Sequence, residues 1–382
     1  MGNRRIKSSL DPGHYFMQGD EALAEGAISA GCRFFAGYPI TPASEIMNRI
    51  VQRFPQVQGK FIQMEDELSS IAAVIGAAWT GMKAMTATSG PGFSLMMENI
   101  GYAVATETPC VIADIQRVGP ATGQATRVGS GDIMQAKWGS HGDYEIIALS
   151  PWSVQEMYDA AIRAFNLSER FRVPVIILGD AAVGHIWETL EVPADLTIFE
   201  REKKPGAPPF GTPEEDGVPP MPSLGDGENL IISGSTHDGF GYKKGEDGAV
   251  NERLVNRLSQ KILRHAEEIW EVEAHDLDNS EAVIIAYGFV ARSALRAVHE
   301  LRQEGKKVGL LRLKTLWPFP EKVIRELSGQ CGTFLVPEMN LGQVVREVER
   351  VARSARVESL NQIDGEPIYP QKIIRAMKGL LS

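Results

Sequence analysis

The sequence predicts an α/β protein of two domains, the larger of which has a parallel sheet with helices on both faces. Three observations support this prediction. Residues 15–192 alternate strand-sized and helix-sized segments, residues 193–248 interrupt the alternation with Pro, Gly and acidic residues, and residues 282–354 resume it. Strands separated by helices of this length form parallel βαβ units. We therefore expect a first domain over residues 1–195, a linker or wrapping insert over 196–252 and a smaller α/β domain over 253–382.

The first domain is expected to alternate strands and helices from its first helix onward. Each short apolar strand ends in a polar or Gly-rich turn that leads into the next helix. The expected strands cover residues 33–37, 60–64, 84–88, 110–114 and 173–178, and the helices cover 20–30, 43–53, 68–81, 93–106 and 154–171.

The insert contains Pro205-Gly206, Pro208-Pro209 and Pro219-Pro220 and too few apolar residues to build a core of its own. We expect it to wrap a neighbouring surface, with a charged helix over 251–272 after it. The second domain should then contain strands over 282–287, 307–314 and 333–337 and helices over 291–304, 321–328 and 341–354.

Composition excludes several classes of protein. A formal net charge of −10 disfavours nucleic-acid binding, which needs a basic face. The N-terminal 20 residues lack the apolar run of a secretory signal, and no stretch approaches the length of a membrane span, so we expect a cytoplasmic protein that contacts no membrane. The three cysteines, Cys32, Cys110 and Cys331, are far apart, so neither an iron–sulfur cluster nor a structural metal is expected on this chain.

The segment from Tyr38 to Glu45 follows an apolar strand and opens a helix. Thr41 suits the N-cap and Pro42 the first helical position. A helix N-terminus at the carboxyl end of a parallel strand also favours an anion. Thr41 is therefore expected to cap the helix, to bind a substrate anion, or to do both.

Three consecutive acids, Glu65, Asp66 and Glu67, stand at the next strand–helix junction. Such acids usually form a solvated first turn favoured by the helix dipole. Helical periodicity places Glu67 on the same face as Ile71 and Val74, so Glu67 is the acid expected to be buried. A buried carboxyl tends to hold or share a proton and can hydrogen-bond a heterocyclic nitrogen.

Arg117 follows the strand that begins at Cys110 and precedes a Gly-rich loop. A guanidinium there suits two-point capture of a carboxylate, although arginines at strand ends are usually only solvated. Lys137 and His141 could add weaker cationic contacts.

Ser89-Gly90-Pro91-Gly92 resembles a phosphate loop superficially but lacks the Lys-Ser/Thr ending, so we interpret it as a tight strand–helix turn that permits close approach of another backbone. Gly225-Asp226-Gly227 with Asn251 resembles the metal motif of thiamine-diphosphate enzymes. It lies in the Pro-rich segment without a buried strand before it, and we reject it as a metal site.

Together these segments resemble the alpha subunits of the 2-oxoacid:ferredoxin oxidoreductase family, particularly the 2-oxoglutarate type. The resemblance covers nearly the whole chain and rests on order and spacing. The matching segments are Gln18 to Ala22, Tyr38 to Glu45, Met64 to Glu67, Thr88 to Gly92, Gln116-Arg117, Lys137 to Asp143, Leu316 to Pro320 and Pro337 to Asn340. Position 20 departs from the pattern, because the family often has Asn where this chain has Asp20.

The resemblance implies a thiamine pyrimidine-binding domain followed by a domain similar to the transketolase C-terminal domain. It implies thiamine diphosphate shared with a separate beta subunit, which would also hold Mg²⁺ and a [4Fe-4S] cluster. Glu67 matches the glutamate that hydrogen-bonds the pyrimidine, and Thr41 and Arg117 match contacts to the substrate carboxylate. Further cofactor contacts are implied at Tyr38, Pro39, Ile40, Ser89 and Gly90. A dicarboxylic oxoacid needs a second cationic contact, which Lys137 or His141 could supply.

The implied reaction is oxidative decarboxylation of a 2-oxoacid to acyl-CoA and CO₂, or its reverse, with ferredoxin as the electron partner and coenzyme A as the acyl acceptor. The implied assembly is α₂β₂. Branched-chain or aryl 2-oxoacids stay open as substrates. The sequence is also compatible with a non-redox thiamine enzyme, such as a transketolase-like or synthase half, and with a non-catalytic regulatory or scaffold subunit that kept the fold.

Overall fold

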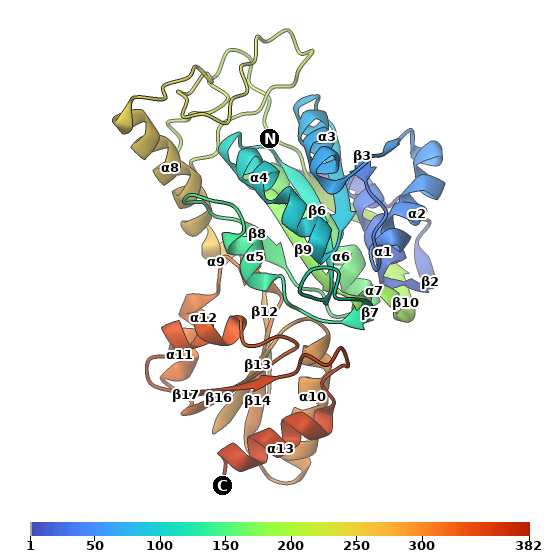
Figure 1. The fold of residues 1–382 in the computed structure, drawn as a ribbon, viewed down its shortest axis with the longest axis vertical. Coiled ribbons are helices and arrows are strands. Elements are labelled where there is room, and N and C mark those ends of the chain that lie inside the picture. Colours follow the sequence, from blue (N-terminus) through green and yellow to red (C-terminus); the bar gives the residue numbers. More distant parts are fainter. Residues whose placement is uncertain (1) are drawn as a thin grey trace.

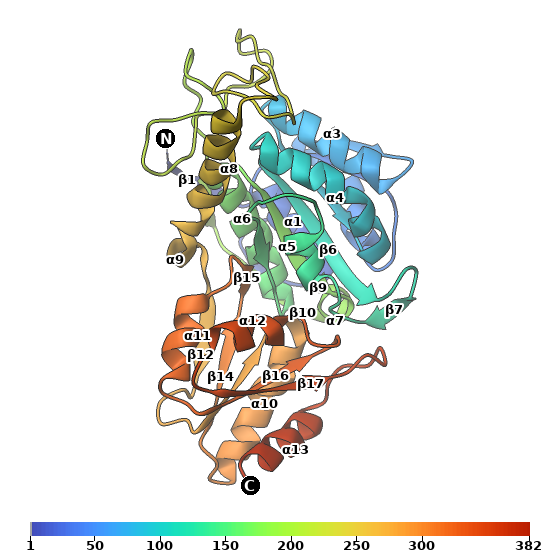
Figure 2. The same cartoon turned by 60° about the vertical axis from the view of Figure 1, so that its left-hand side comes forward.

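The computed structural model describes residues 2–382 and confirms two α/β domains, stacked along the long axis of the molecule (Figures 1 and 2). The first domain has a sheet in the order β15-β8-β9-β6-β5-β3-β4, with β7 added to the far end of β6. The strands from β8 to β4 are parallel, whereas β15 and β7 pair antiparallel. The strand bounds are β3 (Cys32–Gly37), β4 (Lys60–Gln63), β5 (Lys83–Thr88), β6 (Cys110–Val118), β7 (Gln124–Val128), β8 (Ile147–Leu149), β9 (Pro174–Asp180) and β15 (Thr315–Trp317).

Helices cover both faces of this sheet. The pair α3 and α4 lies on one face, and α1 and α6 lie on the other (Figures 1 and 2). The central strands are buried along their whole length, as a sheet covered on both faces requires. The helices are α1 (Gly19–Ser29), α2 (Ser44–Arg53), the 3-10 turn η1 (Phe54–Val57), α3 (Glu67–Trp79), α4 (Gly90–Ala105), α5 (Ile133–Trp138), α6 (Val154–Phe171) and α7 (Ala181–His185).

Two antiparallel ribbons that the sequence did not predict close the first domain. The strands β1 (Asn3–Lys7) and β2 (Gly13–Gln18) pair with β11 (Asp195–Phe199) and β10 (Trp187–Val192), respectively. These strands are short and partly exposed, so they lack the continuous apolar run of the central strands.

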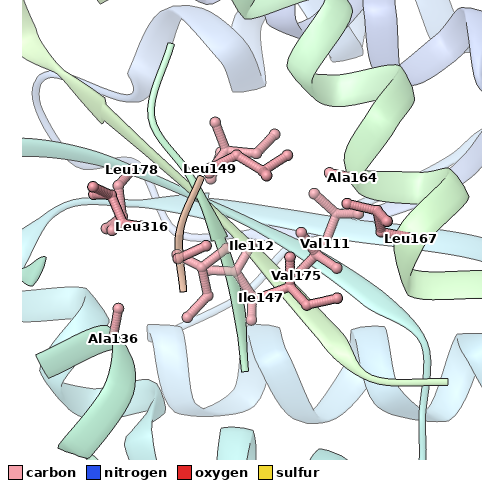
Figure 3. Close-up of a cluster of buried hydrophobic side chains, with 14 of the residues drawn as sticks. Val111, Ile112, Ala136, Ile147, Leu149, Ala164, Leu167, Val175, Leu178 and Leu316 are labelled. Carbon is pink, nitrogen blue, oxygen red and sulfur yellow. The ribbon is translucent and has the colours of Figure 1, made fainter. Parts of the chain in front are cut away.

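The core of the first domain includes a residue from the second half of the chain. Side chains from β6, β8 and β9 pack with those of α6, and Leu316 of β15 belongs to the same buried cluster (Figure 3). The motif around Leu316 and Trp317 therefore anchors the two halves of the chain. Trp317 Nε1 also donates to the carbonyl of Ile133, 2.9 Å away.

The second domain has a five-stranded sheet in the order β12-β14-β13-β16-β17, parallel except for β12. The helices α10 and α13 pack on one face, and α11 and α12 on the other (Figure 1). The elements are β12 (Val272–His275), β13 (Ala282–Ala286), α10 (Gly288–Gln303), β14 (Val308–Leu313), α11 (Glu321–Ser328), β16 (Thr333–Glu338), α12 (Val344–Val351), β17 (Arg356–Asn361) and α13 (Pro370–Leu380). The predicted strands and the first two predicted helices match, whereas β17 and α13 were not expected.

The segment between the domains differs from the prediction in two ways. The expected helix over 251–272 is wrong at both ends, because α8 (Gly248–Leu263) and α9 (Ala266–Ile269) precede the strand β12. The Pro-rich residues also contribute to the core of the first domain, since Phe210 and Met221 are buried in it. Arg172 explains how an irregular backbone can pack there, because its guanidinium donates to the carbonyls of Pro219 and Pro220 at 3.2 and 3.1 Å.

None of the helices in residues 2–382 is both long and apolar enough to cross a membrane.

Candidate active site at the carboxyl edge of the first sheet

The segments singled out in the sequence lie at one edge of the first sheet. Parallel strands present their carboxyl ends together, and β9, β6, β5, β3 and β4 are consecutive neighbours. Ligands bind at this edge in open α/β sheets. Thr41 follows β3, Glu67 follows β4, Ser89 follows β5 and Arg117 is the last residue but one of β6.

Glu67 is the first residue of α3, and its side chain is buried while Glu65 is exposed, as the periodicity predicted. The helix begins here because Asp66 caps it, accepting the backbone N–H of Ser69 at 2.7 Å. Burial raises the pKa of Glu67, with a smaller contribution from Asp66, and Arg117 opposes the shift. The carboxyl is thus disposed to hold a proton that it can donate to a ligand nitrogen.

The segment Ser89 to Gly92 forms the start of α4 rather than a loop, since the helix begins at Gly90. A Cβ on Gly92 would lie 2.3 Å from Glu67 Oε1 and 2.2 Å from Thr88 Oγ1. The close approach expected at this turn is therefore made by a side chain, not by another backbone. The buried hydroxyls of Thr88 and Ser89 have no hydrogen-bond partner within residues 2–382.

Arg117 holds the loop that carries Thr41. Its Nη1 donates to the carbonyl oxygen of Thr41 at 2.7 Å, and its Nε has no partner in the described chain. The expected N-cap role of Thr41 is wrong, because α2 begins at Ser44 after Ala43 and its cap uses no side chain. The side chain of Thr41 is exposed and free of that role. The Gly-rich loop predicted after Arg117 is present as the turn of residues 119–123, and β7, which the sequence did not predict, follows it and pairs with β6.

Two buried carboxyls beneath this edge were missed by the sequence reasoning. Asp114 lies within β6, Asp132 precedes α5, and both have unpartnered oxygens among the described residues. Burial raises the pKa of Asp132 to about 6, and burial together with Asp132 raises the pKa of Asp114 further above its usual range. The pair therefore shares a proton near neutral pH. No sequence signal marks them, because the two acids are distant in the chain and lack a motif.

A cavity of about 490 Å³ opens between the two domains beside these residues. Gly90, Arg117 and Asp132 line it from the first domain, and Met339 and Asn340 from the second. Asn340 Nδ2 donates to the carbonyl of Ser130 at 2.7 Å, which fixes the Pro337 to Asn340 motif against the first domain. Another cavity of about 540 Å³ lies against α6, away from these residues, and two of its acids, Glu156 and Glu271, pair with Lys314.

Lys137 and His141 are not brought to this cavity. Lys137 is buried, and its Nζ donates to Glu145 Oε2 at 2.6 Å and to the carbonyl of Tyr144 at 2.7 Å. His141 is exposed on the following loop. Their assignment as substrate contacts stays a prediction.

The rejected metal motif does not assemble. Asp226 pairs with Lys203, and Asn251 accepts from Thr236, so each side chain has a separate local partner.

An apolar surface adjoins Glu67. Tyr38 and Ile62, at the ends of β3 and β4, and Leu68 and Leu95, on the packed helices α3 and α4, are all exposed. We call these four residues the apolar rim. Asn99 on α4 donates to the carbonyl of Leu68 at 3.3 Å, which links α4 to the first turn of α3.

Two family models match the chain. The model described as "Pyruvate flavodoxin/ferredoxin oxidoreductase, thiamine diP-bdg" matches residues 25–255, and "Pyruvate:ferredoxin oxidoreductase core domain II" matches residues 280–373. The first match ends within α8, and the second begins just before β13.

Curated relatives are similar over nearly their full length. The 2-oxoglutarate synthase subunit KorA of Methanothermobacter thermautotrophicus is 50% identical over 94% of this chain and 97% of its own. The ketoisovalerate oxidoreductase subunit VorB of Methanothermobacter marburgensis is 36% identical over 95% of this chain and 96% of its own.

Solved structures agree on the fold. The 2-oxoglutarate:ferredoxin oxidoreductase from Magnetococcus marinus, with 2-oxoglutarate, coenzyme A and succinyl-CoA bound, matches with a TM-score of 0.91 at 31% identity. The match covers 97% of this chain and 65% of that one. A split-gene transketolase matches with a TM-score of 0.56 at 13% identity, which supports the fold alone.

Proposed function

Because this chain belongs to the thiamine-diphosphate-binding 2-oxoacid:ferredoxin oxidoreductase family, we propose that it is the alpha subunit of a 2-oxoglutarate:ferredoxin oxidoreductase. The overall reaction converts 2-oxoglutarate, coenzyme A and two oxidised ferredoxins to succinyl-CoA, CO₂, two reduced ferredoxins and a proton, or runs in reverse. The observation that carries the proposal is the buried carboxyl of Glu67, held against Gly92 at the cofactor edge of the sheet.

The residues around Glu67 fit the aminopyrimidine of thiamine diphosphate. A protonated carboxyl can donate to a ring nitrogen, and burial raises the pKa of Glu67 in the direction that this bond requires. The unpartnered hydroxyls of Thr88 and Ser89 offer further polar contacts beside it. Tyr38, Pro39, Ile40 and Gly90 complete the proposed cofactor contacts. When bound, thiamine diphosphate supplies the electron sink for decarboxylation.

Thr41 and Arg117 would orient the substrate carboxylate. The guanidinium uses Nη1 on the Thr41 carbonyl, and its Nε remains available to an anion. Arg117 also opposes the rise in the pKa of Glu67, so the guanidinium influences both the proposed substrate contact and the proposed cofactor contact. Neutralising the substrate carboxylate by a positioned guanidinium fixes its orientation before the reaction.

The beta subunit would complete the site from the apolar rim. The apolar rim has the composition of the buried core of a protein–protein interface. A subunit that covered it would exclude water from the reacting groups. In this proposal Mg²⁺, the diphosphate contacts and a [4Fe-4S] cluster belong to the beta subunit, which passes electrons to ferredoxin. The α₂β₂ stoichiometry and the cytoplasmic location stay predictions.

The preferred oxoacid is the least constrained part of the proposal. Similarity favours 2-oxoglutarate, since KorA relatives exceed the ketoisovalerate relatives in identity. A second carboxylate would need a further cation. Lys137 could serve only if it released Glu145, while His141 could serve only if its loop folded inward. Branched-chain and aryl oxoacids are therefore the comparison substrates.

The test is anaerobic co-expression with the beta subunit, followed by CoA-dependent viologen reduction with a panel of 2-oxoacids. We expect reduction that needs both chains, is fastest with 2-oxoglutarate and is lost in Glu67→Gln. The matched control is Glu65→Gln, which removes an exposed acid two residues away and should keep activity. A complex that binds thiamine diphosphate but reduces no dye with any 2-oxoacid would exclude the redox function.

A further inference from the structure

Three side chains that could ligate a metal meet behind the loop that carries Thr41. Asp20 comes from the first turn of α1, Glu45 from the first turn of α2 and His185 from the last turn of α7. One ligand atom from each lies within 4.8 Å of the others. His185 Nε2 is 3.5 Å from Glu45 Oε2 and 3.2 Å from the carbonyl oxygen of Pro42.

Asp20 is the unexplained member of this group. Asp20 is fully buried, with 0% of its surface exposed, yet neither of its carboxyl oxygens has a hydrogen-bond partner anywhere in residues 2–382. A fully buried carboxylate without a partner is strongly destabilising, so something must neutralise it.

Glycines line the space around the Asp20 carboxyl, where a larger residue would clash with it or with the neighbouring backbone. A Cβ on Gly184 would lie 2.7 Å from Asp20 Oδ1, so α7 approaches the carboxyl with glycine. Gly19 likewise approaches the carbonyl of Val183, where its Cβ would lie 2.0 Å away. The two helices thus bring Asp20 and His185 to one point.

A proton on the His185 ring does not give Asp20 a hydrogen-bond partner. A proton on His185 Nε2 can bond the Pro42 carbonyl or Glu45, but it leaves both oxygens of Asp20 without a partner. With the proton on Nδ1, Nε2 presents a lone pair toward the same acceptors. One cation placed between them can then contact Asp20, Glu45, His185 Nε2 and the Pro42 carbonyl. Metal bonds to nitrogen or oxygen are about 2.0–2.2 Å long, so small side-chain movements bring these atoms to bonding distance of one ion.

We propose that Asp20, Glu45 and His185, with the Pro42 carbonyl, form a site for a divalent transition-metal ion of the Zn²⁺ or Mn²⁺ class. Imidazole with carboxylate oxygens favours these ions over Ca²⁺ or Mg²⁺, which take oxygen ligands almost exclusively. The half-exposed Glu45 and His185 provide the entry path, and Asp20 forms the closed end. The site is separate from the Mg²⁺ expected on the beta subunit.

Such an ion would hold the loop that carries Thr41 from the side opposite Arg117. Pro42 follows Thr41 directly, and Arg117 holds the Thr41 carbonyl from the other side. A ligand bond to the Pro42 carbonyl would therefore restrict the same short loop at two adjacent peptide units. The ion's role would be positional, because none of its ligands lines the cavity beside Arg117.

The test measures metal content, not activity. The complex with the beta subunit is treated with a chelator, equilibrated with ZnCl₂ or MnCl₂, desalted and analysed by mass spectrometry for metal per alpha chain. We compare wild type with Asp20→Asn and His185→Gln. The control is Glu21→Gln, which changes the neighbouring acid of the same helical turn but lies outside the ligand group. The difference between variants cancels metal held elsewhere in the complex.

We expect wild type and Glu21→Gln to retain about one more ion per chain than either ligand variant. Affinity should fall at least about 10-fold in the variants, because changes even to outer-shell partners of a metal cost that much. His185→Gln guards against misfolding, since His185 is half-exposed. Equal metal content in wild type and both ligand variants would overturn the proposal and leave Asp20 as a buried, protonated carboxyl.

Discussion

The carboxyl of Glu67 lies in the space that any side chain at position 92 would occupy. A Cβ on Gly92 would be 2.3 Å from Glu67 Oε1, whereas ordinary van der Waals contact begins beyond about 3.4 Å. The first turn of α3 can therefore pack against the first turn of α4 only because α4 has glycine at position 92. The position of the proposed catalytic acid is set by the residue facing it.

Gly92→Ala is expected to abolish most activity without unfolding the chain. The added methyl group must displace the Glu67 carboxyl, and a shift of about 1 Å at a catalytic group costs on the order of 100-fold in rate. The readouts are kcat for dye reduction and thiamine-diphosphate affinity of the complex. Gly379→Ala is the control, because a Cβ there meets nothing within 4 Å in the distant helix α13. Unchanged kinetics in Gly92→Ala would mean that Glu67 does not need this position.

The sequence predicted the parts of the fold that depend on local patterns. Strands such as β9 and β13 are buried throughout, so their apolar runs identify them directly. The ribbons β1–β11 and β2–β10 were missed because they depend on pairing across 169 to 196 residues between short, half-polar strands. The sequence predicted that the Pro-rich segment wraps a neighbouring surface, but it did not predict that Arg172 would bind the carbonyls of Pro219 and Pro220, because that contact depends on tertiary structure.

The candidate site likewise contains some residues that the sequence predicts and others that it does not. Glu67 was found because its helical face can be read from the residues that follow it, and the structure buries it as expected. Asp114, Asp132 and the group around Asp20 were missed because their partners come from separate elements. Lys137 was selected by charge alone, and its ion pair with Glu145 depends on tertiary geometry that the sequence does not display.

Arg117→Lys should weaken substrate binding more than it weakens the fold. Lysine can replace the charge but not the simultaneous contact with the Thr41 carbonyl and an anion. Hydrogen bonds to charged groups contribute about 1.5–3 kcal/mol, so kcat/KM should fall about 10- to 100-fold, mainly through KM. Arg127→Lys, on the exposed strand β7, is the control. It should change kcat/KM less than about 2-fold, because Arg127 forms an exposed ion pair and such pairs contribute little. An equal loss in both variants would remove Arg117 from the substrate site.

Asp132→Asn should stabilise the chain more at pH 8 than at pH 4.5. Burial raises the pKa of Asp132 to about 6, so the folded state favours the protonated acid. For such a group the stability is fully present below the unfolded pKa, about 3.9, and is lost as pH rises through about 6. Asparagine cannot ionise, so the variant avoids that loss. The apparent Tm of variant and wild type, measured at both pH values, gives the comparison.

The control for this pH dependence is Asp143→Asn, which removes an exposed acid from the nearby loop. Its Tm difference from wild type should be small at both pH values. If Asp132→Asn shows the same difference at pH 4.5 and pH 8, Asp132 ionises normally in the folded chain and does not share a proton with Asp114.

Glu107→Gln tests whether buried charge holds the irregular segment on the first domain. Glu107 bonds Arg257 Nη2 at 2.6 Å and Lys261 Nζ at 2.7 Å, and Arg257 also donates to the carbonyl of Phe210 at 2.8 Å. Burial alone would raise the pKa of Glu107, but Lys261 and Arg257 outweigh it and hold the pKa well below its usual range. Removing the carboxylate leaves buried cations unpaired, which costs about 3–5 kcal/mol.

That loss corresponds to an apparent Tm lower by about 5–15 °C for a domain of this size. Glu98→Gln, at an exposed position of α4, should leave Tm unchanged. The deficit should also shrink as pH rises from below 7 towards about 8, the pKa of Lys261 in wild type. Burial already lowers the pKa of Lys261 to about 8, and without Glu107 it falls further, so the lysine becomes neutral within the fold as pH rises. A buried cation with a lowered pKa destabilises the fold only while it is protonated, hence the recovery at high pH. A Tm deficit that stays constant from below pH 7 to about pH 8 would show that lost packing, not unpaired charge, is responsible.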